Sequence, residues 1–350
     1  MKRRIFAGLF FCVLLSLISC VSQKSMLIDV EKPAEITLPI AAQNVIIVDN
    51  AVPQPMGYGI SAPSGRYTDI DSLYIMTLIT ASWRVAMKAF NDLDNSKFFS
   101  NVSIYRKPLR NDHEWLSVVP VKEEVKNDFF ENENFDMLIS IDRLLFNSTI
   151  EKNKRELGKM ETLLTFSAYI RGESKPIIRQ TITDTLKAYL SEDSFFDGMP
   201  PIRPEEINTQ LILRTSLDLG EELGKSFVPG WETVSRMYFI KNISDANRTN
   251  NFINNNSWVE AKNTWTDEFN KESKVVKRAR LANNVALASE MIGEFYQAEE
   301  WAMKAKTLFQ NVSSTKYSKE VRYLEEYIKT LQERQKNNII LDKQHGISQR

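Results

Sequence analysis

Cysteine and histidine are scarce in this chain, and their scarcity excludes several classes of protein. Among 350 residues there are two cysteines, Cys12 and Cys20, and two histidines, His113 and His345. A disulfide framework needs several cysteine pairs, and a zinc site normally takes three or four nitrogen or sulfur ligands. The sequence therefore predicts no disulfide scaffold and no metal site, and we expect no cofactor.

The chain also lacks an excess of either charge. Lysine and arginine total 45, and aspartate and glutamate total 45, which gives a formal net charge of +0. Proteins that bind nucleic acid usually carry a strongly basic surface. We therefore expect no nucleic-acid partner.

The first residues carry a targeting signal. The basic cluster 2–4 is followed by an apolar run over residues 5–18, and the run leads into Leu-Ile-Ser-Cys at 17–20. The run is shorter than the roughly 20 residues that a membrane-spanning helix needs. This pattern resembles the lipobox of bacterial lipoproteins, a resemblance that covers only these twenty residues. It implies a signal peptide over residues 1–19 and lipid on Cys20.

Lipid on Cys20 would hold the protein on a membrane, because each buried methylene contributes about 0.8 kcal/mol. The residue after the cysteine is Val21, so the aspartate that commonly retains lipoproteins in the inner membrane is missing. We expect the periplasmic face of the outer membrane. An uncleaved anchor, or an ordinary secretory signal with a chance cysteine, are the alternatives.

Residues 41–230 alternate between strand and helix signals, after an expected tether at 20–40. An apolar, β-branched run at 44–49 is typical of a buried strand, and apolar residues from Ile70 to Ala86 follow the rhythm of one helix face. The remaining expected elements are strands at 102–105 and 136–146, a hairpin of 162–171 with 177–189, and helices at 121–130 and 204–227.

This order predicts a mixed α/β sandwich domain, so that the whole chain is of the α+β class. The domain resembles the small α/β domains of envelope lipoproteins and of the TolB amino-terminal and CsgG type. The resemblance lies in the order of its expected strands and helices, and in the strand that follows directly on the tether. A resemblance at the level of the fold implies no function by itself.

The carboxyl-terminal third, residues 231–335, is expected to be helical. Its small residues, among them Ala286, Gly293, Ala298 and Ala305, resemble the tetratricopeptide repeat, in which small side chains permit two antiparallel helices to pack closely. Trp258-Val259-Glu260-Ala261 gives a weaker second match. The resemblance implies two degenerate repeats over about residues 236–310, although the usual tryptophan and closing proline are missing.

A final helix is predicted from an apolar seam. Tyr317, Val321, Leu324, Ile328 and Leu331 recur at steps of four and three residues. We expect this helix to cap the last repeat, with a coiled-coil dimer as the alternative, and residues 336–350 to form a flexible tail.

No set of residues in the sequence predicts a reaction. His113 lies in a polar stretch, and Ser313-Ser314-Thr315-Lys316 matches the Ser-x-x-Lys pattern of penicillin-interacting enzymes without the Lys-Thr-Gly that such enzymes need. Gly57 and Gly59 lack the spacing of a phosphate-binding loop. We therefore expect no enzyme and no catalytic residue.

Two functions of different kinds remain. The first is a non-enzymatic scaffold or protein-binding module of the cell envelope that uses the helical repeats. Its partner-binding residues would be Arg236, Tyr238, Asn283, Asn284 and Glu290, since an asparagine on an inner helix can hold a peptide backbone with both its donor and its acceptor; solvated helix residues are the plain alternative. The second function is a small-ligand-binding protein or hydrolase that acts through the α/β domain.

Overall fold

The computed structural model describes residues 23–39, 42–55, 57–60, 70–152, 156–189, 207–240, 246–313 and 315–346. The chain divides into two compact units. The α/β unit comprises Pro33–Gly230 with the residues from Lys343 onward, and the helical unit comprises Trp231–Asp342 with the amino-terminal segment through Lys32.

The α/β unit follows the predicted order of strands and helices. Its elements are β2 (Asn44–Asp49), α2 (Ile70–Ser96), β3 (Asn101–Ile104), α3 (Glu123–Asn127), the π-helix η1 (Asp128–Asn132), β4 (Met137–Lys152), β5 (Glu156–Ile170), β6 (Ile178–Tyr189) and α4 (Ile207–Phe227). The expectation of an α+β protein with a carboxyl-terminal helical region is confirmed.

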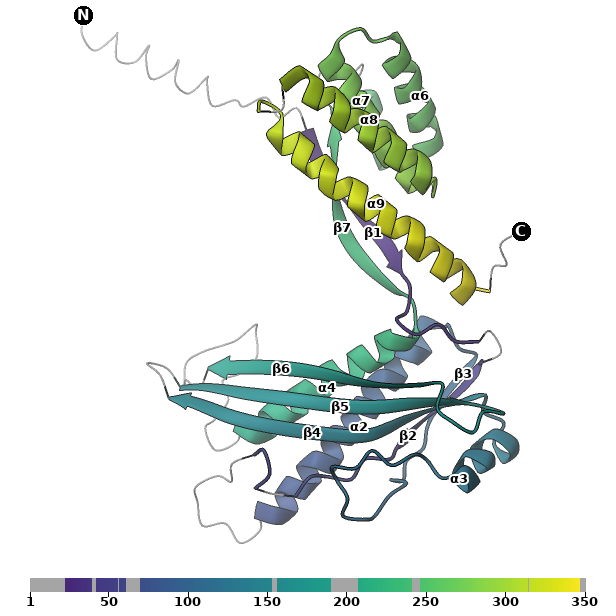
Figure 1. The fold of residues 1–350 in the computed structure, drawn as a ribbon, viewed down its shortest axis with the longest axis vertical. Helices are drawn as coiled ribbons and strands as arrows, with labels where there is room; N and C mark the ends of the chain where they lie inside the picture. Colours follow the sequence, from purple (N-terminus) through teal and green to yellow (C-terminus); the bar gives the residue numbers. More distant parts are fainter. Residues whose placement is uncertain are drawn as a thin grey trace, which may run out of the picture. The chain divides into compact units, whose positions relative to one another are not determined.

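Five strands form one sheet in the order β3-β2-β4-β5-β6 (Figure 1). The strand β2 pairs in parallel with β3 and β4, whereas β4, β5 and β6 form antiparallel pairs. The hairpin predicted from alternating residues is β5 and β6, in which Ala168 pairs with Ile178. Because β2 and β3 are parallel, both end at the same edge of the sheet, beside Asp49 and Ile104.

The helices α2 and α4 lie side by side over one face of this sheet (Figure 1). Their approach is close because α4 carries glycine where it meets α2. A Cβ on Gly220 would lie 2.7 Å from Lys88 Cβ and 2.7 Å from the Val85 carbonyl oxygen. The opposite face of the sheet is covered by a second apolar cluster that includes Val121, Phe129 and Tyr169.

The helical unit contains two strands and five helices within the described part of the chain. They are β1 (Gln23–Lys32), β7 (Gly230–Phe239), α5 (Ala246–Asn254), α6 (Trp258–Lys271), α7 (Val275–Met291), α8 (Phe295–Ser313) and α9 (Ser318–Gln344). The strands β1 and β7 form a two-stranded sheet of their own. Thr233 donates a hydrogen bond to Asp29 across this pair at 2.6 Å.

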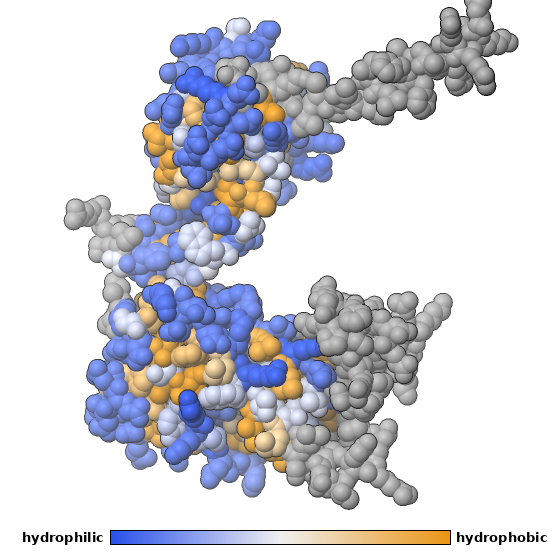
Figure 2. Space-filling view, turned by 180° about the vertical axis from the view of Figure 1, so that it is seen from behind, coloured by the Kyte–Doolittle hydropathy of each residue, from blue (hydrophilic) through white to orange (hydrophobic). Residues whose placement is uncertain are grey.

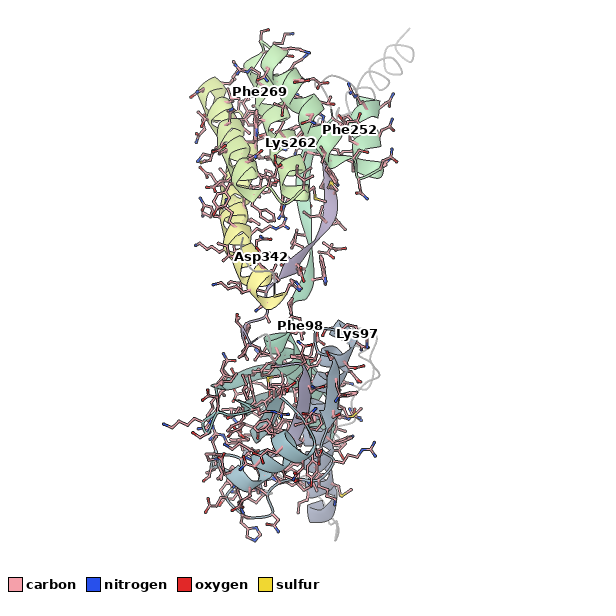
Figure 3. The ribbon with its side chains drawn as sticks, turned by 90° about the vertical axis from the view of Figure 1, so that its right-hand side faces the viewer. Lys97, Phe98, Phe252, Lys262, Phe269 and Asp342 are labelled. Carbon is pink, nitrogen blue, oxygen red and sulfur yellow. The ribbon has the colours of Figure 1, made fainter. Side chains whose placement is uncertain are left out.

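Small residues line the helix contacts of this unit, as their spacing predicted. Ala286, Ala298 and Ala305 are fully buried in one core, and Gly293 makes the turn between α7 and α8 with a φ of +81°. Around them pack aromatic residues such as Phe252 on α5 and Phe269 on α6, which Figure 3 labels. Leu324 and Leu331 of α9 join the same core, so the apolar seam predicted on this helix packs inside the unit.

Several expected boundaries were wrong. Residues expected to form a tether include the strand β1, whose Ile28 and Val30 are buried while the alternate side chains face outward. The expected helical region opens with the strand β7. Trp231, the second residue of this strand, is 71% exposed.

The flexible tail expected at 336–350 was also wrong over much of its length, because α9 continues to Gln344. The side chain of Gln344 accepts a hydrogen bond from the Ala34 N–H and donates one to the Ala34 carbonyl oxygen, each at 3.0 Å. This pairing, together with the buried Leu341, holds the end of the helix. Among the residues described, none of the helices is both long and apolar enough to cross a membrane.

Candidate functional site

The five residues predicted to bind a partner do lie together, where β7 packs against α7. All five are buried, although we expected them to bind a partner and therefore to be accessible. Glu290 ends its helix with a carboxylate that is completely enclosed. The role of each side chain therefore follows from the groups that it contacts within the chain.

Arg236 and Glu290 form a bidentate ion pair. The Arg236 Nε lies 2.9 Å from Glu290 Oε2, and its Nη2 lies 2.9 Å from Oε1. Two further groups donate to the Glu290 carboxylate. They are Arg334, at 2.5 Å, and the Tyr327 hydroxyl, at 2.7 Å. Burial alone would raise the pKa of Glu290, but the hydrogen bonds and charge of Arg236 outweigh it and lower that pKa.

Asparagine does hold a peptide backbone here, but the backbone belongs to β7. The Asn284 amide accepts the Phe239 N–H and donates to the Phe239 carbonyl oxygen, each at 2.8 Å. Asn283 donates to the Met237 carbonyl oxygen at 3.0 Å. The position that a partner's peptide was expected to take is thus occupied by the chain's own strand, and Tyr238 is buried with it. The predicted partner surface is corrected accordingly: these residues fasten β7 to α7.

An open cavity lies instead in the α/β unit, at the edge where β2 and β3 end. Its volume is about 280 Å³. The lining comes from the end of β2 and the following loop, from α2, from β3 and the segment after it, and from β4. Ligands commonly bind beyond the carboxyl ends of parallel strands, because the loops that follow diverge there. Sequence analysis missed this site.

Two polar groups meet in this cavity. Asp49 ends β2, and its Oδ1 accepts the Ala51 N–H at 3.1 Å. Ser82 reaches the same cavity from α2, is 6% exposed, and its Oγ has no well-formed hydrogen bond to any described residue. Burial raises the pKa of Asp49, while the nearby Ser82 hydroxyl and the Ala51 N–H lower it to a smaller extent.

Two arginines also reach the cavity. Arg110 donates to both carboxylate oxygens of Asp112, at 2.8 and 2.7 Å, and to the carbonyl oxygens of Glu114 and Ser117. Its charge is therefore largely neutralised. Arg106 is exposed and makes no ion pair within the described ranges.

The outer surface of α2 beside the cavity is apolar. Ile79 is 49% exposed and Trp83 is 38% exposed, and both also line the cavity. One turn earlier, Ile75 and Met76 are exposed as well. Figure 2, which views the unit from the side of its helices, shows apolar side chains gathered among polar ones. An apolar strip that continues into a pocket is typical of a binding surface.

A second buried carboxylate lies on the other face of the sheet. Asp142 accepts hydrogen bonds from Ser140 Oγ at 2.6 Å and Ser167 Oγ at 2.5 Å, and from Asn50 Nδ2 at 3.4 Å. Burial raises its pKa, although these donors act in the opposite direction. The group is enclosed by its own partners, so it is better placed to fasten strands than to bind a ligand.

The remaining sequence candidates do not join the cavity. His113 is exposed and does not line it. Within the described residues, no cluster of three or more histidine, cysteine, aspartate or glutamate side chains is arranged to hold a metal ion. Cys20 and the expected signal peptide at 1–19 lie outside the described residues.

Two family models match parts of this chain. The family model described as "Domain of unknown function (DUF8603)" matches residues 42–239, more than half of the sequence. The chain belongs to this family. A second model, described as "Domain of unknown function (DUF6340)", matches residues 247–333. The first match thus covers the α/β unit with β7, and the second covers most of the helices that follow.

Solved structures give only a distant likeness. Two structures of the PelC dodecamer from Paraburkholderia phytofirmans, one of them a point variant, align with 57% of this chain and 98% of their own. Sequence identity is 9% for the variant and 12% for the other, with TM-scores of 0.23 and 0.21. No curated protein matches the sequence.

Proposed function

We propose that this protein is a non-enzymatic lipoprotein of the cell envelope that binds a protein partner. Lipid on Cys20 would anchor it to the outer membrane, facing the periplasm. The observation that carries the binding role is the exposed strip of Ile79 and Trp83 on α2, which continues into the cavity beside Asp49. An aromatic residue at the rim of a pocket is the usual anchor of an interface.

The proposed partner surface lies in the α/β unit, although the sequence favoured the helical repeats. In the helical unit the residues with the best chemistry for a peptide already hold β7. The non-enzymatic assignment rests on the cavity lining, in which Asp49 and Ser82 stand without a histidine to serve as a base. A small-ligand-binding protein is the second candidate, and the convergence of Asp49 and Ser82 favours it.

The partner surface is tested by photocrosslinking in the native envelope. A photoreactive residue at position 79 should crosslink a partner, and one at Thr183, on the exposed polar face of β6, should not. Trp83→Ala should remove the crosslink without lowering the melting temperature, whereas Trp231→Ala, which truncates an exposed tryptophan of the helical unit, should leave it unchanged. Equal crosslinking from both positions would contradict the proposal.

The anchor is tested separately. Cys20→Ser should abolish acylation and release the protein into the soluble periplasmic fraction, because the lipid supplies its membrane affinity. The readout is the distribution between membrane and soluble fractions after a high-salt wash. A variant that stays with washed membranes in cells lacking the crosslinked partner would contradict the lipid anchor.

A further inference from the structure

The cavity beside α2 contains two polar groups, the half-buried carboxylate of Asp49 and the buried hydroxyl of Ser82, that its own residues leave incompletely bonded. The Asp49 carboxylate accepts the Ala51 N–H, and the Ser82 hydroxyl has no well-formed hydrogen bond in the part of the chain described. Buried polar groups in folded proteins are nearly always satisfied, because an unsatisfied one costs about 1–3 kcal/mol. The pair therefore indicates a ligand group or solvent at this position.

The cavity is shaped for an organic group. Its volume of about 280 Å³ far exceeds the roughly 30 Å³ that a water molecule occupies in the liquid. Leu78, Leu144 and Phe146 supply apolar walls, and the aromatic side chains of Trp83 and Tyr105 lie on the lining. An apolar body with one polar end fits such a lining.

We infer that this cavity binds a primary ammonium group on an apolar stem, with the ammonium held by Asp49 and Ser82. An ammonium carries three donors, which match the carboxylate oxygens and the serine hydroxyl oxygen as acceptors. Trp83 and Tyr105 would add an attraction between the cation and their ring faces. The stem would pack against Leu78 and Phe146.

The charges around the cavity favour a cation at its inner end. An anion placed there would meet the half-buried carboxylate of Asp49, and like charges repel more strongly at a partly enclosed site than in bulk water. Arg110 is neutralised by Asp112, and the exposed Arg106, which makes no ion pair with the described residues, can donate to a carboxylate or backbone carbonyl on the outer part of the same ligand. Burial raises the pKa of Asp49, and a bound cation would lower it again.

The ammonium has two possible sources: a lysine side chain of a partner protein, or a free amine. In the first case the inference rests on the proposed function, because the lysine would enter beside the Ile79 and Trp83 strip. Both sources would place the same ammonium group beside the Asp49 carboxylate. The experiment therefore tests a free amine and a lysine-containing peptide separately.

The test uses the full-length chain in lipid nanodiscs and isothermal titration calorimetry, with empty nanodiscs as background. The probes are phenethylamine, its neutral isostere phenethyl alcohol, and the anion phenylacetate. Phenethylamine should bind most tightly. Asp49→Asn and Ser82→Ala should each weaken it, by about tenfold or more for the charged contact. Asp218→Asn is the matched control, since it removes another carboxyl of this unit whose pKa burial raises, away from the cavity.

The source is resolved with a peptide that carries one lysine between apolar residues, compared with the same peptide bearing acetyllysine. Binding that acetylation abolishes assigns a partner lysine, and binding of the free amine alone assigns a small molecule. Phenylacetate binding as tightly as the amine, amine binding that neither variant weakens, or no binding by any probe would overturn the inference. The envelope crosslink from position 79 in the wild-type chain tests the proposed function separately, because it requires neither Asp49 nor Ser82.

Discussion

Replacing Glu290 with glutamine should destabilise the helical unit more than any comparable change on its surface. The carboxylate is fully enclosed, and Arg236, whose side chain is 7% exposed, depends on it for a counter-charge. Removing one partner of a buried ion pair costs about 3–5 kcal/mol, because the other charge is left without compensation. For a unit of this size we expect the melting temperature to fall by about 10 °C or more.

Differential scanning calorimetry of the full chain measures this shift, with Glu294→Gln as the matched control. Glu294 pairs with Lys262 at a partly exposed site, where an ion pair contributes about 0–1 kcal/mol (Figure 3 labels Lys262). Because the pKa of Glu290 lies below its usual 4.5, the contribution of this carboxylate is present above that pH and is lost only as the pH falls through the lowered value. Equal shifts for the two variants, or a difference that disappears above pH 4.5, would refute the reasoning.

Three further changes test the packing and the cavity. Ala298→Leu adds atoms to a fully buried helix contact and should cost about 1–3 kcal/mol in chemical denaturation, whereas an unchanged midpoint would mean that this contact is loose. Gly220→Ala should destabilise the α/β unit by a similar ~1–3 kcal/mol, because its Cβ would lie 2.7 Å from the Val85 carbonyl oxygen; a gain in stability would show that α2 and α4 separate easily. Asp49→Asn should raise the melting temperature at neutral pH, since burial raises the pKa of Asp49 and penalises its ionised form. That gain should shrink as the pH falls through the raised pKa, and a variant less stable than wild type at neutral pH would contradict it.

The elements that the sequence predicted well are those with a strong period. The alternation of β6 marks one strand of the hairpin because one of its faces is exposed, and the apolar rhythm of α2 and α4 defines the helices over the sheet. The central strand β5 is buried on both faces from Leu164 to Tyr169, where its polar residues Thr165 and Ser167 are enclosed. The alanines of α7 and α8 marked their contacts because only small side chains allow that approach. The parallel pairing of β2 with β3 and β4 was not predicted, since pairing depends on residues far apart in the chain.

The strand β1 was missed for a physical reason. Only Ile28 and Val30 of its ten residues are buried, so the segment has too few inward apolar residues to differ from a polar tether. The cavity was missed because Asp49 and Ser82 belong to different elements, and the sequence does not show that α2 crosses the end of β2. One signal was available: Asp49 directly follows a β-branched run, at the end of a strand.

The candidate residues of the helical unit show how a correct grouping led to a wrong role. The sequence grouped Arg236, Asn284 and Glu290 as one site, and all three do connect β7 with α7: Arg236 pairs with Glu290, and Asn284 binds the backbone of Phe239. What it did not reveal is that the peptide held by Asn284 is Phe239 of the same chain. A side chain suited to hold a partner's backbone is equally suited to hold its own.

The pairing of β1 with β7 makes the α/β unit an insertion between two adjacent strands of the helical unit. About two hundred residues of chain separate Asp29 from its partner Thr233 (|i−j| = 204). A chain that emerges from its amino terminus therefore presents β1 long before β7 exists, with Leu27, Ile28 and Val30 uncovered. The α/β unit has most of its sequence available first, so its folding can bring Lys32 and Gly230 to the positions from which the two strands meet. The helical unit is then the last part to form, and until it does, β1 is an unpaired strand edge, a feature that favours pairing with other chains.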